Sequence, residues 1–253
     1  MPAQSAEGII LRKYLLRETS YILVVFTENF GKIRGVMKGV RNPYPQFAGN
    51  FEIFTRCDLL FYRKHKRPMD LITHCEAVDF YLPVRKDIER LTYANYFIEL
   101  INVVTSDYDP NEELYRVLVR SLEMLGTGSS AKRVSRIFEI KTLGAIGLRP
   151  ELDICCGCGG ELGTGSVFSI SSGGTVCSGC ASRSGSYLRL SPGTLKFLRK
   201  IQSSEIDRLA HIKVSSQVGR ETERILKSFM AYHLGRQMRS LKFLETLQKE
   251  RII

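Results

Sequence analysis

Stretches rich in Ile, Val, Phe and Tyr alternate with turn residues along the first 80 positions of the chain. Each stretch is short enough for a β-strand, and Asn29-Phe30-Gly31 is typical of a tight hairpin connection. The predicted strands are residues 7–14, 20–28, 32–39, 51–62 and 70–80. Five short strands favour a small closed barrel, of which the OB-fold is the common five-stranded form. A fragment of a β-sandwich is the competing architecture.

Alternation within these stretches predicts which side chains face the barrel core. In the third stretch Ile33, Gly35 and Met37 would point inward, because successive strand residues face opposite sides. The opposite side carries Lys32, Arg34, Val36 and Lys38, which we interpret as an outward basic stripe that Arg41 extends. Phe51, Ile53, Cys57, Leu59 and Phe61 share one face of the fourth stretch. We therefore expect Cys57, and by analogy Cys75, to be core residues rather than reactive thiols.

From Asp87 onward the hydrophobic period becomes helical. Leu91, Ala94, Ile98 and Ile101 recur at helical spacing with a second apolar stripe beside them, which predicts a central helix. Further helices are predicted at 111–125, 131–146 and 216–234, and a short one opens at Ser191-Pro192. We expect Val218, Thr222, Ile225, Phe229 and Tyr232 to form the apolar stripe of the helix at 216–234. Together with the strands, these helices indicate an α+β multidomain chain.

The net charge of +11 gives information about the binding partner rather than about the fold. The excess lies in residues 1–83, with +4, and in residues 181–253, with +9. A basic excess of this kind favours a polyanionic partner, although a solvated basic surface is the alternative. The tip between the fourth and fifth strands, with Arg63, Lys64, Lys66 and Arg67, would grip phosphate or simply keep the hairpin soluble.

Five of the seven cysteines fall between positions 155 and 180. Cys155 and Cys158 form one C-x2-C pair, Cys177 and Cys180 form another, and 18 residues separate the pairs. This spacing predicts a four-cysteine zinc ribbon with a structural Zn²⁺. An alternative assignment pairs Cys156 with Cys158 as C-x-C, which makes a poorer metal-binding turn. A redox-active dithiol pair is the other chemical possibility. Residues 151–180 hold no Lys or Arg, which favours a structural role over direct contact with DNA.

The predicted segments suggest four parts: an OB-fold domain (1–82), a helical domain in two parts (83–150 and 184–253, the second basic), and a zinc module (151–183) between them. We find no Gly-rich phosphate loop and no metalloprotease or nucleophile-elbow motif, so no catalytic residue is predicted. No apolar window is long enough to span a membrane, and the N-terminus does not look like a signal peptide. A cytoplasmic, nucleoid-associated protein without a membrane partner is expected.

In this order of parts the chain resembles the RecO family of bacterial DNA repair proteins. The resemblance lies in EGIILRKYLLRETSYILVVFTENFGKIRGVMKGVRNP, in FEIKTLGAIGLRPELDICCGC, and in the CSGC knuckle followed by Ser191-Pro192. It implies a non-enzymatic recombination mediator that binds single- and double-stranded DNA and anneals complementary strands. Such a protein works with RecR on DNA coated by single-stranded DNA-binding protein (SSB), which lets RecA load at gaps. An OB-fold and zinc-ribbon RNA-binding protein of translation or transcription is the alternative.

Candidate DNA-binding residues follow from the basic stripe, the basic tip and the helix at 216–234. They are Lys32, Arg34, Lys38, Arg41, Arg63, Lys64, Lys66, Arg67, Arg220, Arg224 and Lys227. Tyr14, Tyr21, Phe54 and Tyr62 are aromatic side chains that could stack on bases, but the favoured interpretation of each is a structural residue of the barrel core or surface. The resemblance also implies a site for the acidic, apolar C-terminal tail of SSB, for which Arg120, Arg133 and Arg136 are candidates.

Overall fold

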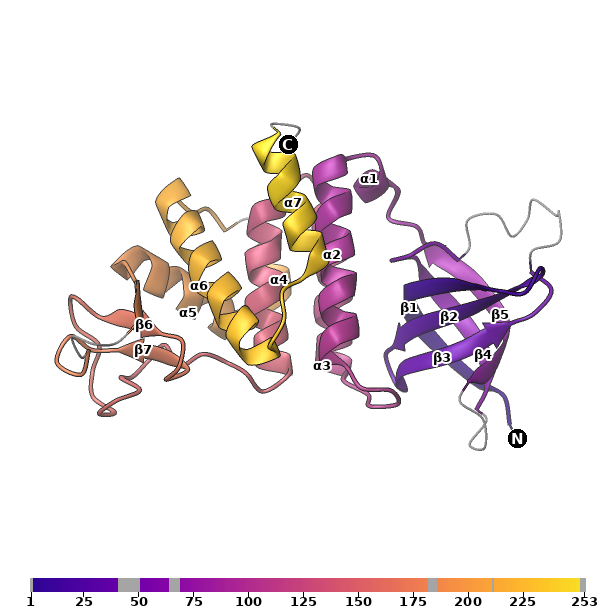
Figure 1. Ribbon diagram of the computed structural model, residues 1–253, viewed down its shortest axis with the longest axis horizontal. Helices are drawn as coiled ribbons and strands as arrows, with labels where there is room; N and C mark the ends of the chain where they lie inside the picture. The colour runs from indigo at the N-terminus through magenta and orange to yellow at the C-terminus, as the bar shows by residue number, and fades with distance from the viewer. Residues whose placement is uncertain (1, 41–50, 64–68, 182–185, 211, 251–253) are drawn as a thin grey trace. The chain divides into compact units, whose positions relative to one another are not determined.

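The computed structural model describes residues 2–40, 51–63, 69–181, 186–210 and 212–250 (Figure 1). The chain divides into two compact units. One contains residues 1–127 with 238–253, and the other contains residues 128–237. In this division the predicted helix at 131–146 belongs to the same unit as the cysteine-rich segment 151–180. The division into four parts stays a prediction. Among the described residues, no helix combines the length and apolarity that crossing a membrane requires.

Five strands close into a barrel in the first unit, as the strand pattern predicts (Figure 1). They are β1 (Gln4–Leu16), β2 (Ser20–Thr27), β3 (Gly31–Met37), β4 (Arg56–Tyr62) and β5 (Asp70–Asp79). The order is β1-β2-β3-β5-β4, and β4 pairs with β1 to complete the closure. Only the pair β3–β5 is parallel. β4 begins at Arg56 rather than at residue 51, because Phe54 has a positive φ of 54° that interrupts the strand.

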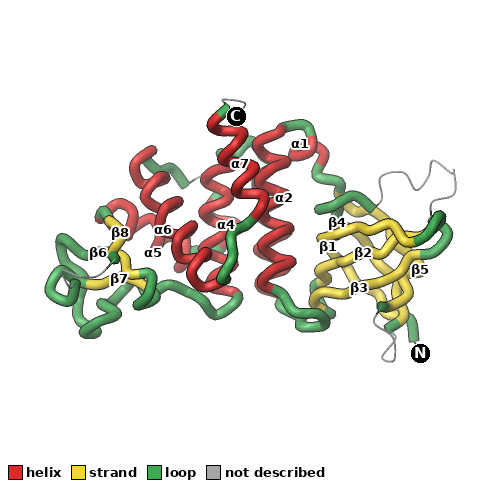
Figure 2. Tube along the Cα trace, viewed as in Figure 1, coloured by secondary structure: helices red, strands yellow, loops and turns green. Residues whose placement is uncertain are grey.

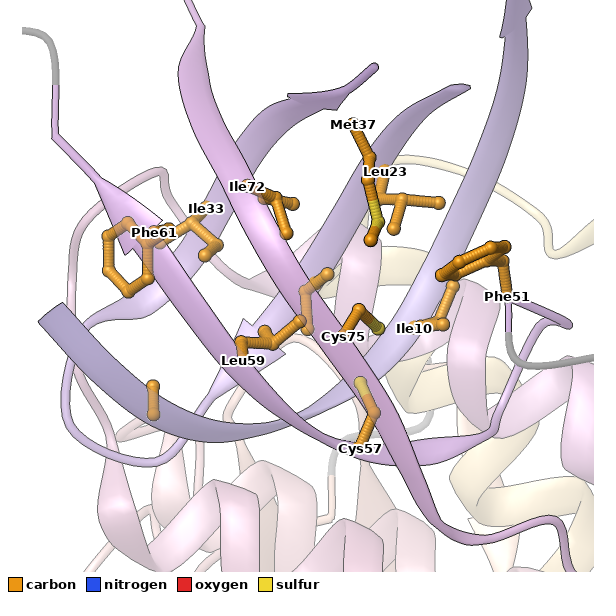
Figure 3. Close-up of a cluster of buried hydrophobic side chains, with 12 residues drawn as sticks. Ile10, Leu23, Ile33, Met37, Phe51, Cys57, Leu59, Phe61, Ile72 and Cys75 are labelled. Atoms are coloured by element: carbon orange, nitrogen blue, oxygen red, sulfur yellow. The ribbon is translucent and has the colours of Figure 1, made fainter. Parts of the chain in front are cut away.

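Apolar side chains from all five strands fill the barrel (Figure 3). The inward prediction for Ile33 and Met37 is confirmed, and Cys57, Leu59 and Phe61 lie in the same core. Cys57 and Cys75 are both buried there, as predicted. A hydrogen bond with Cys75 and burial together raise the pKa of Cys57, so this thiol stays neutral. Ile53 is only half-buried and lies before the strand.

A segment after the first long helix runs beside the start of β3. The N–H of Tyr108 donates to the carbonyl of Lys32 at 2.9 Å. Gly31 has a φ of 66°, and a Cβ there would lie 2.3 Å from the carbonyl oxygen of Asp109. Only glycine fits both the backbone angle and this close approach. The segment therefore covers the start of β3, where β5 has not yet begun to pair.

The described residues of the first unit also form four α-helices: α1 (Leu82–Arg85), α2 (Ile88–Val104), α3 (Glu112–Gly126) and α7 (Arg239–Lys249). Asp87 and Asn111 cap α2 and α3 by accepting hydrogen bonds from the N–H groups of Arg90 and Leu114. α2 buries side chains around most of its circumference, which confirms the central helix. α7, which the hydrophobic pattern did not predict, packs against α2.

In the second unit, the residues that the structure describes form three further α-helices and a small sheet. The helices are α4 (Ala131–Ala145), α5 (Pro192–Ser203) and α6 (Ser216–Leu234), with a 3₁₀ turn at Ile206–Leu209. The sheet has the order β7-β6-β8, from β6 (Val167–Ser169), β7 (Gly174–Val176) and β8 (Tyr187–Arg189). Figure 2 shows that most of this cysteine-rich part is loop. The predicted helices at 131–146 and 216–234 are confirmed, and so is the short helix that opens at Ser191-Pro192.

One detail of the α6 prediction is wrong. Tyr232 is 60% exposed, and Leu226 and Met230 are buried in its place. The buried stripe follows the faces that α4 and α5 cover, since α6 packs against both. The aromatic ring of Phe229 meets that of Phe168 of β6 at 5.7 Å, which joins the helix to the small sheet.

Candidate metal centre and basic surfaces

The four cysteines of the two C-x2-C pairs converge on one point. The sulfurs of Cys155, Cys158, Cys177 and Cys180 all lie within 4.8 Å of one another. Cys158 Sγ and Cys177 Sγ are 3.9 Å apart. Four sulfurs at such separations match the tetrahedral cage that binds Zn²⁺ through thiolates. It is the one group of metal-ligand side chains of its kind in the part of the chain that the structure describes.

Backbone groups support the sulfur of Cys155. The N–H of Cys177 donates to it at 3.2 Å, and the N–H of Gly157 donates at 3.3 Å. The hydrogen bond from Cys177 lowers the pKa of Cys155 to about 6, because it stabilises the thiolate. A Cβ at Gly157 would lie 3.0 Å from the Cβ of Cys180. Glycine at this position therefore lets the two knuckles approach each other.

The cage of four sulfurs favours a cation, and Cys156 is not part of it. A hydrogen bond with Cys158 raises the pKa of Cys180 to about 12, as expected where neighbouring sulfurs would otherwise crowd negative charge. Cys156 lies outside the cluster. Its N–H donates to the carbonyl of Thr175 at 2.9 Å, and burial raises the pKa of its thiol. The geometry thus selects Cys155 over Cys156 as the partner of Cys158.

The basic surface of the barrel lies on the outer face of β1, β2 and β3. Strand register places Arg12, Val24 and Arg34 in one row across the three strands. Tyr14, Ile22 and Val36 form the next row. Arg34 is exposed, and its Nε lies 3.1 Å from the carboxylate of Asp107. Lys38 is exposed at the end of β3.

The burial of Lys32 differs from the prediction that it belongs to an exposed basic stripe. Its orientation on the outer face is as expected, but the residue is only 5% exposed. Its Nζ donates to the carbonyls of Asn102 and Thr105 at 3.0 and 2.6 Å, because the end of α2 and the segment after it cover this end of β3. Burial lowers the pKa of Lys32, although Asp107 partly offsets that effect. Lys32 therefore anchors the helix end to the barrel rather than facing a partner.

The basic tip is described only at its first residue. The guanidinium of Arg63 lies 4.1 Å from the ring centre of Tyr108, a cation–π contact that holds it against the barrel. Arg41, Lys64, Lys66 and Arg67 fall outside the described residues. In the second unit, Arg220, Arg224 and Lys227 are all exposed on α6. Their charged face agrees with the helix pattern, and contact with DNA stays a prediction.

The three arginines proposed for an acidic tail differ in burial and in their partners. Arg136 is 5% exposed, and its Nη1 lies 3.2 Å from Glu139 of the same helix, which leaves its charge compensated inside the second unit. Its prediction as an accessible basic residue is wrong. Arg133 donates to the carbonyl of Ala210 at 3.3 Å. Arg120 belongs to the other unit and pairs with Glu123 at 2.8 Å.

Of the four aromatic candidates, one is open to a partner. Phe54 is buried at 2% exposure, and Tyr21 and Tyr62 are half-buried. Tyr14 is 46% exposed. Its hydroxyl accepts a hydrogen bond from Nη1 of Arg12 at 3.2 Å. Arg12 was missed by the stripe prediction because the pairing of β1 with β2 shifts between Ile10 and Arg12, which breaks simple alternation.

Comparisons with known proteins agree with this architecture. The family model described as "Recombination protein O N terminal" matches residues 1–81, and "Recombination protein O C terminal" matches residues 85–242. A protein named DNA repair protein RecO from Pelotomaculum thermopropionicum is 31% identical over 97% of this chain and 94% of its own length. Proteins of the same name from Desulforamulus reducens and Syntrophus aciditrophicus are each 30% identical, over 100% and 96% of this chain and 98% and 95% of their own lengths.

Proposed function

The chain belongs to the RecO family of DNA repair proteins, and we propose that it acts as a recombination mediator that holds DNA chiefly through phosphate contacts. The observation that carries this proposal is the row of cations on the outer face of the barrel, where Arg12 and Arg34 flank Val24. Arginine binds phosphate through two parallel hydrogen bonds, and each neutralised phosphate releases counterions. Lys38 and Arg63 extend this proposed surface. Arg41, Lys64, Lys66 and Arg67, which fall outside the described residues, stay predicted DNA contacts.

A second basic surface on α6 supports the annealing of complementary strands. Annealing brings two polyanions together, so positive charge must be presented over an extended area. Arg220, Arg224 and Lys227 supply such charge in the second unit, independently of the barrel. We propose that the protein binds single- and double-stranded DNA through these two surfaces. No catalytic chemistry is needed for this task.

The partners of the proposed function follow from family membership. We propose that the protein works with RecR on strands coated by SSB, which allows RecA to load at gaps. Arg120 and Arg133 remain candidates for the acidic SSB tail, whereas the compensated charge of Arg136 is no longer available for it. Location in the cytoplasm with the nucleoid belongs to the same proposal. Family membership counts against a role in translation or transcription.

We propose that the four-cysteine cage binds a structural Zn²⁺. The donor set supports this, since four thiolates close the coordination sphere and leave no position for a reacting water. The ion would supply the folding energy that the ribbon lacks, because residues 151–180 contain few apolar residues to form a core. Cys155, Cys158, Cys177 and Cys180 would hold the ion, and Cys156 would not.

Salt dependence tests the phosphate-based mode of binding. The affinity for a labelled single strand is measured from low to moderate salt, and Arg34→Gln is compared with the parent chain. We expect a steep fall with salt, and the substitution should reduce the slope of log affinity against log salt by about 1. An affinity that hardly changes with salt would overturn the proposal. The control is Arg208→Gln, which replaces an exposed arginine of the second unit. Arg136→Gln would not serve as the control, because the charge of Arg136 is buried.

A further inference from the structure

A carboxylate lies among the cations of the barrel surface. Asp107 belongs to the segment that follows α2, and its Oδ2 lies 3.1 Å from Nε of Arg34. The other oxygen, Oδ1, lies 3.9 Å from Nζ of Lys32. The side chains of Arg34 and Asp107 are 53% and 42% exposed. An anion that approaches Arg34 therefore meets a negative charge as well as a positive one.

The backbone holds Asp107 at this place. Lys32 and Asp107 form a parallel β-bridge, and the N–H of Tyr108 donates to the carbonyl of Lys32 at 2.9 Å. Tyr108 has a positive φ of 58°, which is rare for a bulky side chain and persists only where the surroundings enforce it. Its hydroxyl donates to Asp70, the first residue of β5. The position of Asp107 beside β3 is therefore part of the fold.

The carboxylate takes one side of the Arg34 guanidinium. A guanidinium presents five N–H donors in a rigid fork, and phosphate binds it best through two of them. Asp107 faces the Nε side of this fork. In the same row, Arg12 is held by neutral groups, the hydroxyl of Tyr14 at 3.2 Å and the amide oxygen of Asn102 at 3.3 Å. A phosphate at Arg34 thus competes with a carboxylate, whereas these neutral groups do not repel a phosphate at Arg12.

Two effects of Asp107 on the binding of phosphate oppose each other. The ion pair orients Arg34, but a pair as exposed as this one holds its partners weakly. The carboxylate also repels a phosphate that lies a few ångströms away, and this repulsion is stronger near the protein surface than in bulk water. Repulsion therefore outweighs orientation.

We infer that Asp107 weakens the hold of Arg34 on phosphate, so that the barrel releases DNA faster than its cations alone would allow. This inference rests on the proposed DNA-binding function and adds to it a residue that limits affinity. A mediator must give up the strand that it delivers, and a fixed competitor at one phosphate contact keeps binding reversible. Because the effect concerns phosphates, it applies to single and double strands alike.

Removal of this charge should tighten DNA binding, a result that partial unfolding of the variant would not produce. Asp107→Asn keeps the size of the side chain, and its affinity is compared with that of the parent for a fluorescent oligothymidine and for a duplex. At low salt we expect about fivefold tighter binding of both, mainly through slower dissociation into excess unlabelled DNA. The gain should shrink as salt rises, because exposed charges are screened.

Two further variants assign the gain to the contact with Arg34. Asp153→Asn is the matched control, since it also removes one negative charge and an ion pair of 3.1 Å, here with Nε of Arg199 in the second unit. It should change DNA affinity less than about twofold, because a screened charge that does not touch the ligand contributes little. In an Arg34→Gln background, Asp107→Asn should likewise gain less than about twofold, since the two residues act on the same phosphate.

The outcomes distinguish the inference from the proposed function. If the parent chain binds DNA and Asp107→Asn binds it no more tightly, the inference is overturned while the proposed function stands. Weaker binding by Asp107→Asn would show that the carboxylate serves to orient Arg34 and would overturn the inference as well. An equal gain in Asp153→Asn would reduce the effect to net charge and contradict it. If the parent chain binds neither form of DNA, the proposed function and the inference fail together.

Discussion

Glu99 of α2 caps the N-terminus of α7 by accepting hydrogen bonds from the N–H groups of Arg239 and Ser240, both at 2.9 Å. The Ser240 hydroxyl also donates to this carboxylate. α7 has no side-chain cap of its own at Met238. These hydrogen bonds outweigh burial and lower the pKa of Glu99. The last helix of the chain is thus fixed to the first unit by a residue about 140 positions away.

Replacing Glu99 should loosen α7 from α2. Glu99→Ala leaves the first N–H groups of α7 without a partner, so we expect a loss of about 1–2 kcal/mol in the free energy of unfolding. Glu99→Gln keeps a neutral acceptor and should lose less. Urea denaturation measures both, and faster hydrogen exchange in residues 239–249 would locate the effect. Glu28→Gln, at an exposed turn, is the control; equal losses in all three variants would contradict the capping role.

Glu221 predicts a pH dependence of stability. Hydrogen bonds from Ser191 and Thr194 outweigh burial and lower its pKa to about 2. A carboxylate with a lowered pKa stabilises the fold above its unfolded pKa of about 4.3. That stabilisation, about 2 kcal/mol, should disappear as the pH falls from about 4 to 2. We expect Glu221→Gln to be less stable than the parent at pH 7, with the difference shrinking through this window. A difference that stays constant with pH would refute the assignment.

Cysteine substitutions test the metal cage with a control from the same knuckle. Cys158→Ser should lose bound zinc and unfold the ribbon, since a structural zinc contributes folding energy of about 10 kcal/mol. Cys156→Ser should retain one zinc per chain, because Cys156 lies outside the cluster. Elemental analysis of the purified proteins gives the zinc content, and thermal unfolding gives the stability. Loss of zinc from both variants would contradict the ligand set.

Lys32 and Arg34 should have opposite effects although both lie on β3. Lys32→Met leaves the carbonyls of Asn102 and Thr105 without their donor, so the free energy of unfolding should fall by about 2 kcal/mol. The affinity of the folded fraction for DNA should not change. Arg34→Gln should weaken DNA binding and leave stability within about 0.5 kcal/mol. A fall in DNA affinity for Lys32→Met alone would restore Lys32 as a contact residue.

Much of the fold could be predicted because its signals are local. Strand alternation predicted the core positions of Ile33 and Met37, and Ser191-Pro192 marked the start of α5. The signal of the cysteine pairs is also local, because only two residues separate the two ligands of each C-x2-C pair. Their convergence on one centre follows from the chemistry of thiolates rather than from any long-range prediction.

The features that could not be predicted depend on residues far apart in the chain. Alternation placed Lys32 on the outer face, but it could not show that the residues after α2 cover that end. α7 depends on Glu99 for its cap, and no local signal announces such a contact. The row formed by Arg12 and Arg34 could not be predicted either, because the irregular pairing in β1 shifts Arg12 into register with Arg34 across β2.

Annealing of two complementary DNA strands, each precoated with SSB, tests the proposed mediator function most directly. The rate is measured with and without the protein, and direct binding to the same strands is measured in parallel. We predict faster annealing with the parent chain and a weaker acceleration with Arg34→Gln. Intact DNA binding without any acceleration would contradict the mediator function and leave a basic OB-fold protein with a different task.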